Sequence, residues 1–239
     1  MIFHVKRSPL APSATSIALR ISIWLLMLDS IVEITFASSA TAWLNDTASH
    51  KIFRFTADGS RHHLSGLPLH FIVNQVDTSN SAAIIALVVI GIWGSVSLWL
   101  RNLTQYRTGT FANFSRCCYY LWVSFNIPAL ILTGAALIYV LAVTNTRGGQ
   151  KIDTALAVDL NGSPYNQNTW TPQSWFSAVL RLKLVRDRED ITRHLHVIRG
   201  WQYNLILMFH FQLAETVFAF MDYKRWIHKP KLHEACSGL

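Results

Sequence analysis

The sequence is poor in charge and in cysteine, and each shortage excludes a class of protein. Only 14% of its 239 residues are charged, whereas a soluble domain usually carries about 25%. The three cysteines, Cys117, Cys118 and Cys236, lie outside the two long polar segments at 45–81 and 144–200. No disulfide framework can therefore form in those segments. The shortages argue against a soluble globular domain and against a small disulfide-rich secreted domain.

The charge that is present has an excess of bases, with 21 Lys and Arg against 13 Asp and Glu and a net charge of +8. These bases are scattered over polar segments and the C-terminal region and form no single stripe of the kind that binds nucleic acid. They fit contact with anionic lipid headgroups better. We therefore expect the lipid bilayer to be a partner and nucleic acid not to be one.

Long apolar runs take the place of the missing charge, and each is about as long as the roughly 20 residues that cross a bilayer. They predict an all-α fold, a four-transmembrane-helix antiparallel bundle with a partly helical second outer loop. The expected order is a disordered cytoplasmic tail at 1–16, spans at 17–44, 82–100, 118–143 and 201–221, outer loops at 45–81 and 144–200, an inner loop at 101–117 and a basic cytoplasmic tail at 222–239.

Three local patterns refine this plan. Asp58-Gly59 is a two-residue hairpin signal between apolar positions in the first outer loop. Gly91 and Gly94 offer small surfaces for close helix packing in the second span. Pro128 lies inside the third span and predicts a kink there.

The second outer loop carries a helix signal at Thr171-Pro172, an N-cap residue followed by proline at the first helical position. Trp175 and Phe176 fall on one face of the helix that follows. Two interpretations remain open: this helix lies in the membrane interface, or it packs on the protein's own loops.

The same loop predicts a further helix before the last span. Asp187 is placed to cap a helix over 188–199, and Gly200 is the expected joint between that helix and the span at 201–221.

The orientation follows from the density of the bases, because their number on the two sides is nearly equal. Short segments rich in Lys and Arg and poor in acids are expected to be cytoplasmic, which places both termini in the cytoplasm. We expect an integral membrane protein of an endomembrane or the plasma membrane. Among the Asn-X-Ser/Thr sequences, Asn45 and Asn161 are the glycosylation candidates, and Asn161 lies further from a span.

Ionisable residues inside the spans are the candidate site. Asp29 and Glu33, four residues apart, share one face of the first span, and His210 and Glu215 lie in the last span. The depths allow Glu33 to meet His210, and we expect this pair because it makes a charge-assisted hydrogen bond. The two residues of the last span differ by about 140° around the helix, so Glu215 lines up instead with Asn204 and Asp222.

Three functions are compatible with these groups, and the third is a proton or ion path, which would need an oligomer because four helices rarely enclose a pore. They can hold the helices of a non-catalytic protein together, or Asp29, Glu33, His210 and Glu215 can be the catalytic residues of a membrane-embedded acid–base enzyme, isomerase-like or cyclase-like, that acts on a lipophilic substrate. The histidines of the first outer loop, among them the adjacent His62-His63, lack the spacing of metal ligands. We therefore expect no metal and no cofactor.

Three cysteines are candidates for lipidation. Cys117-Cys118 follows Arg116 at a predicted cytoplasmic edge and is compatible with palmitoylation or with a plain buried thiol pair. Cys236 is fourth from the C-terminus and has the spacing of a prenylation box, although Ser237 and Gly238 are poor matches for its aliphatic positions.

One segment, 169–206, resembles a recurring stretch in fungal four-span membrane proteins of uncharacterised function. The matching features are Trp170-Thr-Pro, Trp175, the run 193–199 and the stretch from Trp201 to Asn204. The resemblance implies a fungal origin and a four-span fold, and it brings no catalytic residues. Combined with the residues themselves, it favours a non-catalytic accessory or scaffold protein, attached to a secondary-metabolite pathway, whose partners are other membrane proteins. The oligomeric state stays open.

Overall fold

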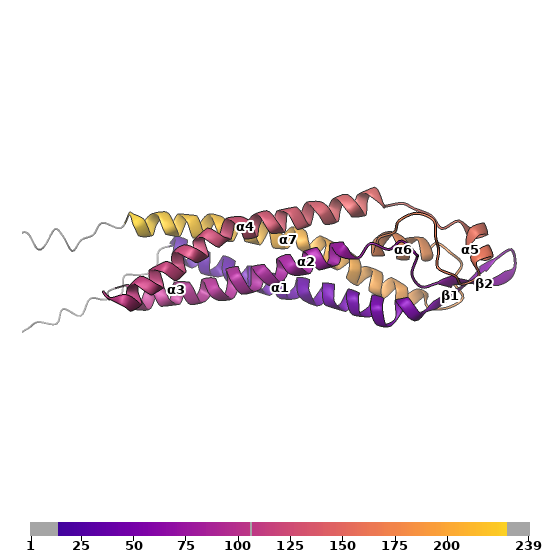
Figure 1. Ribbon diagram of the computed structural model, residues 1–239, viewed down its shortest axis with the longest axis horizontal. Coiled ribbons are helices and arrows are strands. Elements are labelled where there is room, and N and C mark those ends of the chain that lie inside the picture. Colours follow the sequence, from indigo (N-terminus) through magenta and orange to yellow (C-terminus); the bar gives the residue numbers. More distant parts are fainter. Residues whose placement is uncertain (1–13, 106, 229–239) are drawn as a thin grey trace, which may run out of the picture.

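The computed structural model describes residues 14–105 and 107–228. Its described part is elongated, with long helices lying side by side and a small folded end piece (Figure 1). The long helices are α1 (Ala14–Asp46), α2 (Asn74–Ile85), η2 (Ala86–Ile92), α3 (Trp93–Thr104), α4 (Thr110–Thr146) and α7 (Arg188–Ile227). Because α2, η2 and α3 follow one another without a break, they form one helical rod over 74–104. We call the four rods the bundle.

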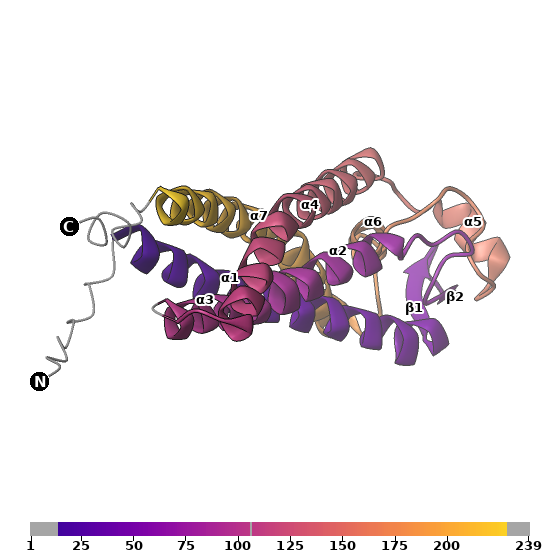
Figure 2. The same cartoon turned by 60° about the vertical axis from the view of Figure 1, so that its left-hand side comes forward.

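The end piece, which we call the cap, gathers the short elements between the rods. It contains η1 (Ala48–His50), β1 (Ile52–Ala57), β2 (Ser60–Ser65), α5 (Thr154–Leu160) and α6 (Pro172–Val179). Both ribbon views place β1, β2, α5 and α6 at the same end of the molecule (Figures 1 and 2). The first residues of α1 and the last residues of α7 lie at the opposite end (Figure 1).

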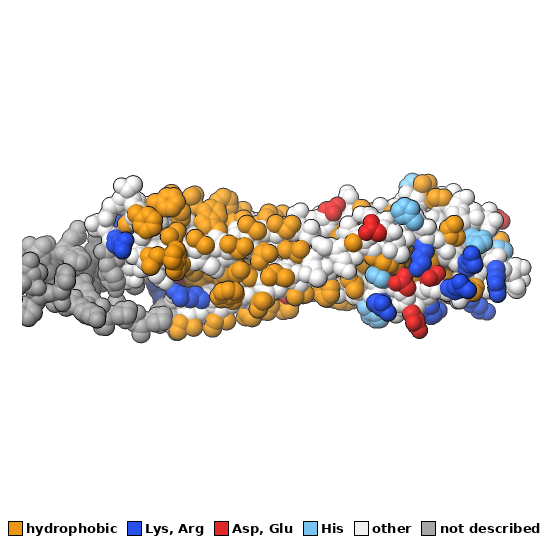
Figure 3. All heavy atoms as spheres, turned by 90° about the horizontal axis from the view of Figure 1, so that it is seen from below, with side chains coloured by type: hydrophobic (Ala, Val, Ile, Leu, Met, Phe, Trp, Pro, Cys, Tyr) orange, Lys and Arg blue, Asp and Glu red, His pale blue; other side chains and the backbone are white. Residues whose placement is uncertain are grey.

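The outer surface divides the molecule into an apolar and a charged part. On the face shown in Figure 3, hydrophobic side chains dominate the bundle, and charged side chains and histidines gather over the cap. Among the described residues, three helical segments are long and apolar enough to cross a membrane: Asn74–Thr104, Thr110–Thr146 and Arg188–Ile227. The chain is therefore compatible with a helical membrane protein.

The second rod contains a stretch of π-helix, η2, and packs closely against its neighbours. A Cβ built on Gly91 would lie 2.3 Å from Met27 Cγ, and one built on Gly94 would lie 2.4 Å from Trp122 Nε1. The predicted role of these glycines in close packing is confirmed. In the same region the indole Nε1 of Trp122 donates a hydrogen bond to the carbonyl oxygen of Ile90 at 3.1 Å.

The hairpin of the cap forms where the sequence predicts it. Asp58 and Gly59 both have positive φ, 49° and 77°, which is the backbone of the two-residue turn that suits the twist of paired strands. A third chain segment runs along β1, because Thr56 N donates to Lys183 O at 2.9 Å and Val185 N donates to Arg54 O at 2.9 Å. The cap sheet thus joins the first and second outer loops.

Helix α6 packs inside the cap, so the interface-helix interpretation is wrong. Its start is as predicted, since the Thr171 and Ser174 side chains and backbones form a reciprocal capping box. Trp175 and Phe176, however, are both 0% exposed. Trp175 Nε1 donates to the carbonyl oxygen of Gly66 at 2.8 Å, and its ring meets those of Tyr165 and Trp170. The apolar face that could have met lipid meets the protein itself: Trp175 meets aromatic rings of the cap, and Phe176 meets Trp43 of α1.

The expected joint at Gly200 is also wrong, because α7 is one helix of 40 residues. A Cβ at Gly200 would lie 3.5 Å from the ring of Phe36, so this glycine is a point of helix contact. Asp187 does stand at the N-cap of α7, but its side chain makes no capping hydrogen bond. At about 1.5 Å per residue, α7 is roughly 60 Å long, twice the thickness of a bilayer core, and it extends from the bundle into the cap.

Parts of the expected tails are helical. Residues 14–16 belong to α1 and residues 222–227 belong to α7. The rest of the predicted tails, 1–13 and 229–239, lies outside the described residues. Helix α4 continues through Pro128 as a single element.

Candidate functional site

Glu33, at the centre of the predicted site, is enclosed by three helical segments. It is 0% exposed. The Ser79 hydroxyl of α2 donates to its Oε1, and the Asn204 amide of α7 donates to its Oε2 at 3.0 Å. Both carboxylate oxygens therefore have a partner, and the group ties α1, α2 and α7 together.

His210 is not the partner of Glu33, and the predicted pairing is wrong. The His210 side chain is exposed on the outside of the bundle, and its Nδ1 contacts the carbonyl oxygen of Ile206 at 2.7 Å. Six residues, or about 120° around the helix, separate it from Asn204, which takes the expected position. The structure turns inward the face that carries Asn204, Glu215 and Asp222, an alignment visible in the sequence.

The other two predicted acids also lie inside the bundle, but they have carboxylate oxygens without hydrogen-bond partners. Asp29 is 7% exposed and Glu215 is 0% exposed. Oδ2 of Asp29 and both carboxylate oxygens of Glu215 have no hydrogen-bond partner among the described residues. The structure therefore separates the four predicted residues into one bonded acid, two acids with unpaired oxygens and one outward-facing histidine.

A second polar cluster lies toward the end of the bundle opposite the cap and was not predicted. Arg101 of α3 forms an ion pair with Oδ2 of Asp222 on α7. Tyr119 of α4 donates its hydroxyl to the same oxygen at 2.9 Å, and the Arg101 guanidinium lies 4.4 Å from the Tyr119 ring centroid. The sequence predicts a loop at Arg101 and a tail at Asp222, whereas both residues lie in helices. The available signal was the position of Asp222 on the face of Glu215.

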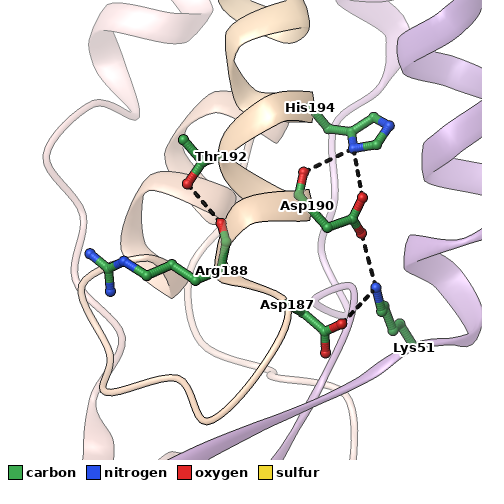
Figure 4. Close-up of polar contacts among 6 residues, drawn as sticks. All are labelled: Lys51, Asp187, Arg188, Asp190, Thr192 and His194. Atoms are coloured by element: carbon green, nitrogen blue, oxygen red, sulfur yellow. Dashed lines mark hydrogen bonds and ion pairs between the residues drawn. The ribbon is translucent and has the colours of Figure 1, made fainter.

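The cap has its own charged cluster where α7 begins (Figure 4). Lys51 Nζ lies 3.1 Å from Asp187 Oδ1 and 2.9 Å from Asp190 Oδ2. His194 Nδ1 lies 2.9 Å from the carbonyl oxygen of Asp190 and 3.2 Å from its Oδ1. Since both of these atoms are acceptors, Nδ1 carries the proton. The His194 ring stacks on Trp43 of α1 with centroids 4.3 Å apart.

The ion pairs of the cap shift the titration of their members. Burial acts to lower the pKa of Lys51, but its hydrogen bonds and charge contacts with Asp190 and Asp187 outweigh burial and leave the pKa raised. Burial acts to raise the pKa of Asp190, but the hydrogen bond and charge of Lys51 and the charge of His194 outweigh it and leave the pKa lowered. The cluster therefore links the start of α7 to the end of α1.

Two surface hollows of about 460 Å³ each lie beside this cluster, over the first turns of α7. The first is lined by 184–190 and Arg193, and the second by Arg188, Glu189, Thr192, Arg193 and His196. Their linings mix acids and bases, which favours no single class of ligand. Neither hollow reaches Asp29, Glu33 or Glu215. Over 14–105 and 107–228, no group of three or more His, Cys, Asp or Glu side chains is placed to hold a metal ion.

The candidate modification sites fall at opposite ends of the molecule. Asn45, near the end of α1, and Asn161, which follows α5 with φ 42°, are exposed at the cap end. Cys117 is exposed and Cys118 partly exposed near the start of α4, away from the cap. Cys236 lies outside the described residues.

Two polar clusters thus occupy the bundle, around Glu33 and around Asp222. A third, in the cap, joins α7 to Lys51 and, through the ring of His194, to Trp43 of α1. Comparisons of the chain with protein-family models, with curated proteins and with solved structures find no match.

Proposed function

We propose that this chain is a four-span integral membrane protein with a non-catalytic accessory or scaffold role, in which the bundle anchors the cap at one membrane face. In this proposal α1 is the fourth span and the rods alternate in direction. The outward side of α1 supports this, because Ile21, Trp24 and Leu28 are 54%, 61% and 58% exposed. Apolar side chains of that size are expected to meet lipid when the protein is in a bilayer.

The main support for a non-catalytic role is that Glu33 is closed off from any substrate. An acid or base must reach its substrate within hydrogen-bond distance. Both carboxylate oxygens of Glu33 instead accept hydrogen bonds, one from Ser79 and one from Asn204, and the side chain has no exposed surface. Interhelical hydrogen bonds of this kind hold membrane helices together, at about 0.6 kcal/mol each on average.

The substitution Glu33→Gln tests this role against acid–base catalysis on a lipophilic substrate. A glutamine can accept from Asn204 through its oxygen and donate to the Ser79 hydroxyl through its nitrogen, so the contacts between helices survive. We expect normal abundance, normal thermal stability in detergent and full complementation of a deletion strain. A stable, inserted variant that fails to complement would overturn the proposal, because an amide cannot take up a proton.

The control is Glu33→Ala, which leaves the Ser79 and Asn204 groups unpaired in the bundle. Stranding buried polar groups costs about 1–3 kcal/mol each. We expect lower abundance and lower thermal stability for Glu33→Ala than for Glu33→Gln. Equal behaviour of the two variants would show that the hydrogen bonds of Glu33 do not hold the helices.

We further propose that both termini are cytoplasmic and that the cap lies on the luminal or outer side. The exposure of Asn45 and Asn161 at the cap end supports this orientation. A reporter fused to the C-terminus should be cytoplasmic, and any glycan should disappear on Asn161→Gln. A luminal reporter would reverse the orientation.

We also propose, from the resemblance of 169–206, a fungal origin and attachment to a secondary-metabolite pathway. The genes that neighbour this one in the genome would test that proposal.

A further inference from the structure

Glu215 is the acid of the bundle for which the protein provides the least compensation. It is 0% exposed, and neither carboxylate oxygen has a hydrogen-bond partner among the described residues. Glu33 and Asp222, by contrast, are bonded to donors on other helices. An ionised carboxylate without a partner in the interior of a membrane protein costs several kcal/mol. The position of Glu215 therefore requires a positive charge or a proton.

The charged and titratable groups around Glu215 do not supply that charge. On α1 the buried acids Glu33 and Asp29 lie nearer the cap, because Glu33 pairs with Asn204, about three turns before Glu215 on α7. The next titratable groups along the bundle are Tyr119 of α4, Arg101 of α3 and Asp222 of α7 itself. Arg101 already forms the ion pair with Asp222 and lies over the Tyr119 ring.

Further unpaired oxygens lie within about one helical turn of Glu215 along the bundle. Ala219 of α7 packs in one cluster with Tyr119 and Val123 of α4. The hydrogen bond between Thr133 of α4 and Gln212 of α7 fixes the register of these two oppositely running helices, and it sets Glu215 about one turn nearer the cap than Asn126. Asn126 is 0% exposed; its amide nitrogen donates to the Trp122 carbonyl at 3.0 Å.

The unpaired polar atoms near Glu215 include acceptors and neutral donors. Asn126 Oδ1 and Thr216 Oγ1, like both oxygens of Glu215, have no hydrogen-bond partner among residues 14–105 and 107–228. One amide donor, Nε2 of Gln212, is also unpaired on α7, while its Oε1 accepts from Thr133 at 2.6 Å. Asn126 Oδ1 and the Glu215 oxygens can only accept, and the unpaired donors near them, the Gln212 amide and the Thr216 hydroxyl, are neutral, so none of these groups supplies a positive charge.

We propose that Glu215, with Thr216 next to it on α7 and Asn126 about one turn away on α4, forms a binding site for a monovalent cation in the bundle interior. The simplest occupant is a proton: it neutralises the carboxylate and turns one of its oxygens into a donor for a neighbouring acceptor. A sodium ion is the other source of the same charge, since carboxylate, carbonyl and hydroxyl oxygens are the ligands that hard cations prefer. This site is separate from the closed Glu33 cluster.

The test is thermal unfolding of the full chain in lipid nanodiscs, comparing wild type with Glu215→Gln. Glutamine keeps the shape and cannot ionise. In the wild type, the unfolded chain exposes Glu215 to water and ionises it as pH rises, while the folded chain holds it neutral. Rising pH from about 5 to about 8 should therefore lower the Tm of the wild type relative to the variant. Glu189→Gln, an exposed acid on the same helix, is the control and should track the wild type.

A second arm of the test distinguishes the occupants. At fixed pH and ionic strength, sodium is exchanged for choline. A Tm that rises with sodium in the wild type and not in Glu215→Gln identifies a sodium site, and a Tm that responds only to pH identifies a proton site. Parallel profiles of wild type and Glu215→Gln against both pH and sodium would overturn the proposal.

If Glu215→Gln fails to insert into the membrane, chemical labelling of the wild-type protein tests the proposal without a variant. A lipophilic carbodiimide adds to a protonated carboxyl: the carboxyl oxygen bonds the central carbon, the proton moves to a nitrogen, and nothing leaves. Mass spectrometry should find the adduct on Glu215, with a rate that falls as pH or sodium rises. Absence of the adduct at Glu215, in a sample where it forms on other membrane carboxyls, would overturn the proposal.

Discussion

The indole Nε1 of Trp122 donates a hydrogen bond to the carbonyl oxygen of Ile90, 3.1 Å away on the neighbouring rod. Ile90 belongs to the π-helical segment η2, which is followed directly by the α-helical turns of α3. The regular hydrogen-bond ladder is interrupted at such a change. Trp122 can approach this carbonyl because Gly94 has no side chain.

Replacing Gly94 by alanine should destabilise the bundle. The new Cβ would lie 2.4 Å from Trp122 Nε1, so the indole must move and the bond to Ile90 must lengthen. We expect a loss of about 1–3 kcal/mol, as for other overpacked interiors, measured as a lower Tm in detergent. Gly200→Ala is the control: its Cβ meets Phe36 at an ordinary 3.5 Å, and alanine favours the helix by up to about 1 kcal/mol. Equal stability of wild type and Gly94→Ala would contradict the close packing of Trp122.

The ion pairs of Lys51 should make the cap sensitive to acid. The lowered pKa of Asp190 means that its stabilising effect is complete above the ordinary aspartate value of 3.8 and is lost as pH falls below it. The raised pKa of Lys51 acts at the opposite limit, because its contribution is lost only as pH rises above the ordinary 10.5. The cap is therefore expected to be most stable between these limits.

Lys51→Met tests this dependence by proteolysis of the cap at different pH values. We expect a loss of less than about 1 kcal/mol at neutral pH, since the partners are partly exposed and water screens them. The difference between variant and wild type should shrink in acid. Lys151→Met, a change at an exposed cap lysine, should have no such effect. A difference independent of pH would mean that Lys51 acts through its packing alone.

Removal of the Trp175 indole N–H should loosen the cap and leave the bundle intact. Trp175→Phe keeps an aromatic ring but leaves the Gly66 carbonyl without its 2.8 Å partner. Leaving a buried acceptor unpaired costs about 1–3 kcal/mol. Hydrogen exchange should accelerate in β1, β2 and α6 and stay unchanged in α4. In the control Trp99→Phe, at a side chain 61% exposed on the outside of α3, exchange in the cap should be as in wild type. Uniform acceleration over the bundle would show that cap and bundle unfold together.

His210→Leu should be neutral or stabilising. The side chain is exposed on the apolar outside of α7 and bonds only its own helix, so its loss should change stability by less than about 0.5 kcal/mol. A buried partner of Glu33 would instead cost about 1–3 kcal/mol when removed. The measurement is the Tm in nanodiscs, with Asn204→Leu as the contrasting variant. A large loss of stability for His210→Leu would contradict the exposed position of His210 and indicate that its side chain is buried.

Local signals in the sequence predicted local structure well. The hairpin at Asp58-Gly59 and the helix start at Thr171 depend on residues within one turn of each other, and both form as expected. The apolar runs likewise predicted the long helices, because a long run of apolar residues needs no knowledge of its neighbours. Prediction failed where a face had to be assigned. The face of α6 that carries Trp175 is the same whether it meets lipid or protein.

The prediction that Glu33 pairs with His210 failed for a related reason. Depth along a helix can be counted in residues, but its rotation depends on what the other helices present. Glu33 meets Asn204 because Ser79 approaches from the second rod and closes the space, and nothing near position 204 or 210 encodes that. The 11-residue spacing of Asn204 and Glu215, about three full turns, was the available clue.

The continuity of α7 has a mechanical consequence. One helix carries Asp190 and His194 in the cap, Glu215 in the interior and Asp222 near the far end, with no break at Gly200. A straight α-helix resists bending, so a push or twist on the cap is not absorbed at a hinge. It is transmitted as tilt or rotation of the whole rod, over roughly 60 Å. Any contact that tilts or rotates the cap end of α7 therefore also displaces Glu215 and Asp222, which the same helix carries.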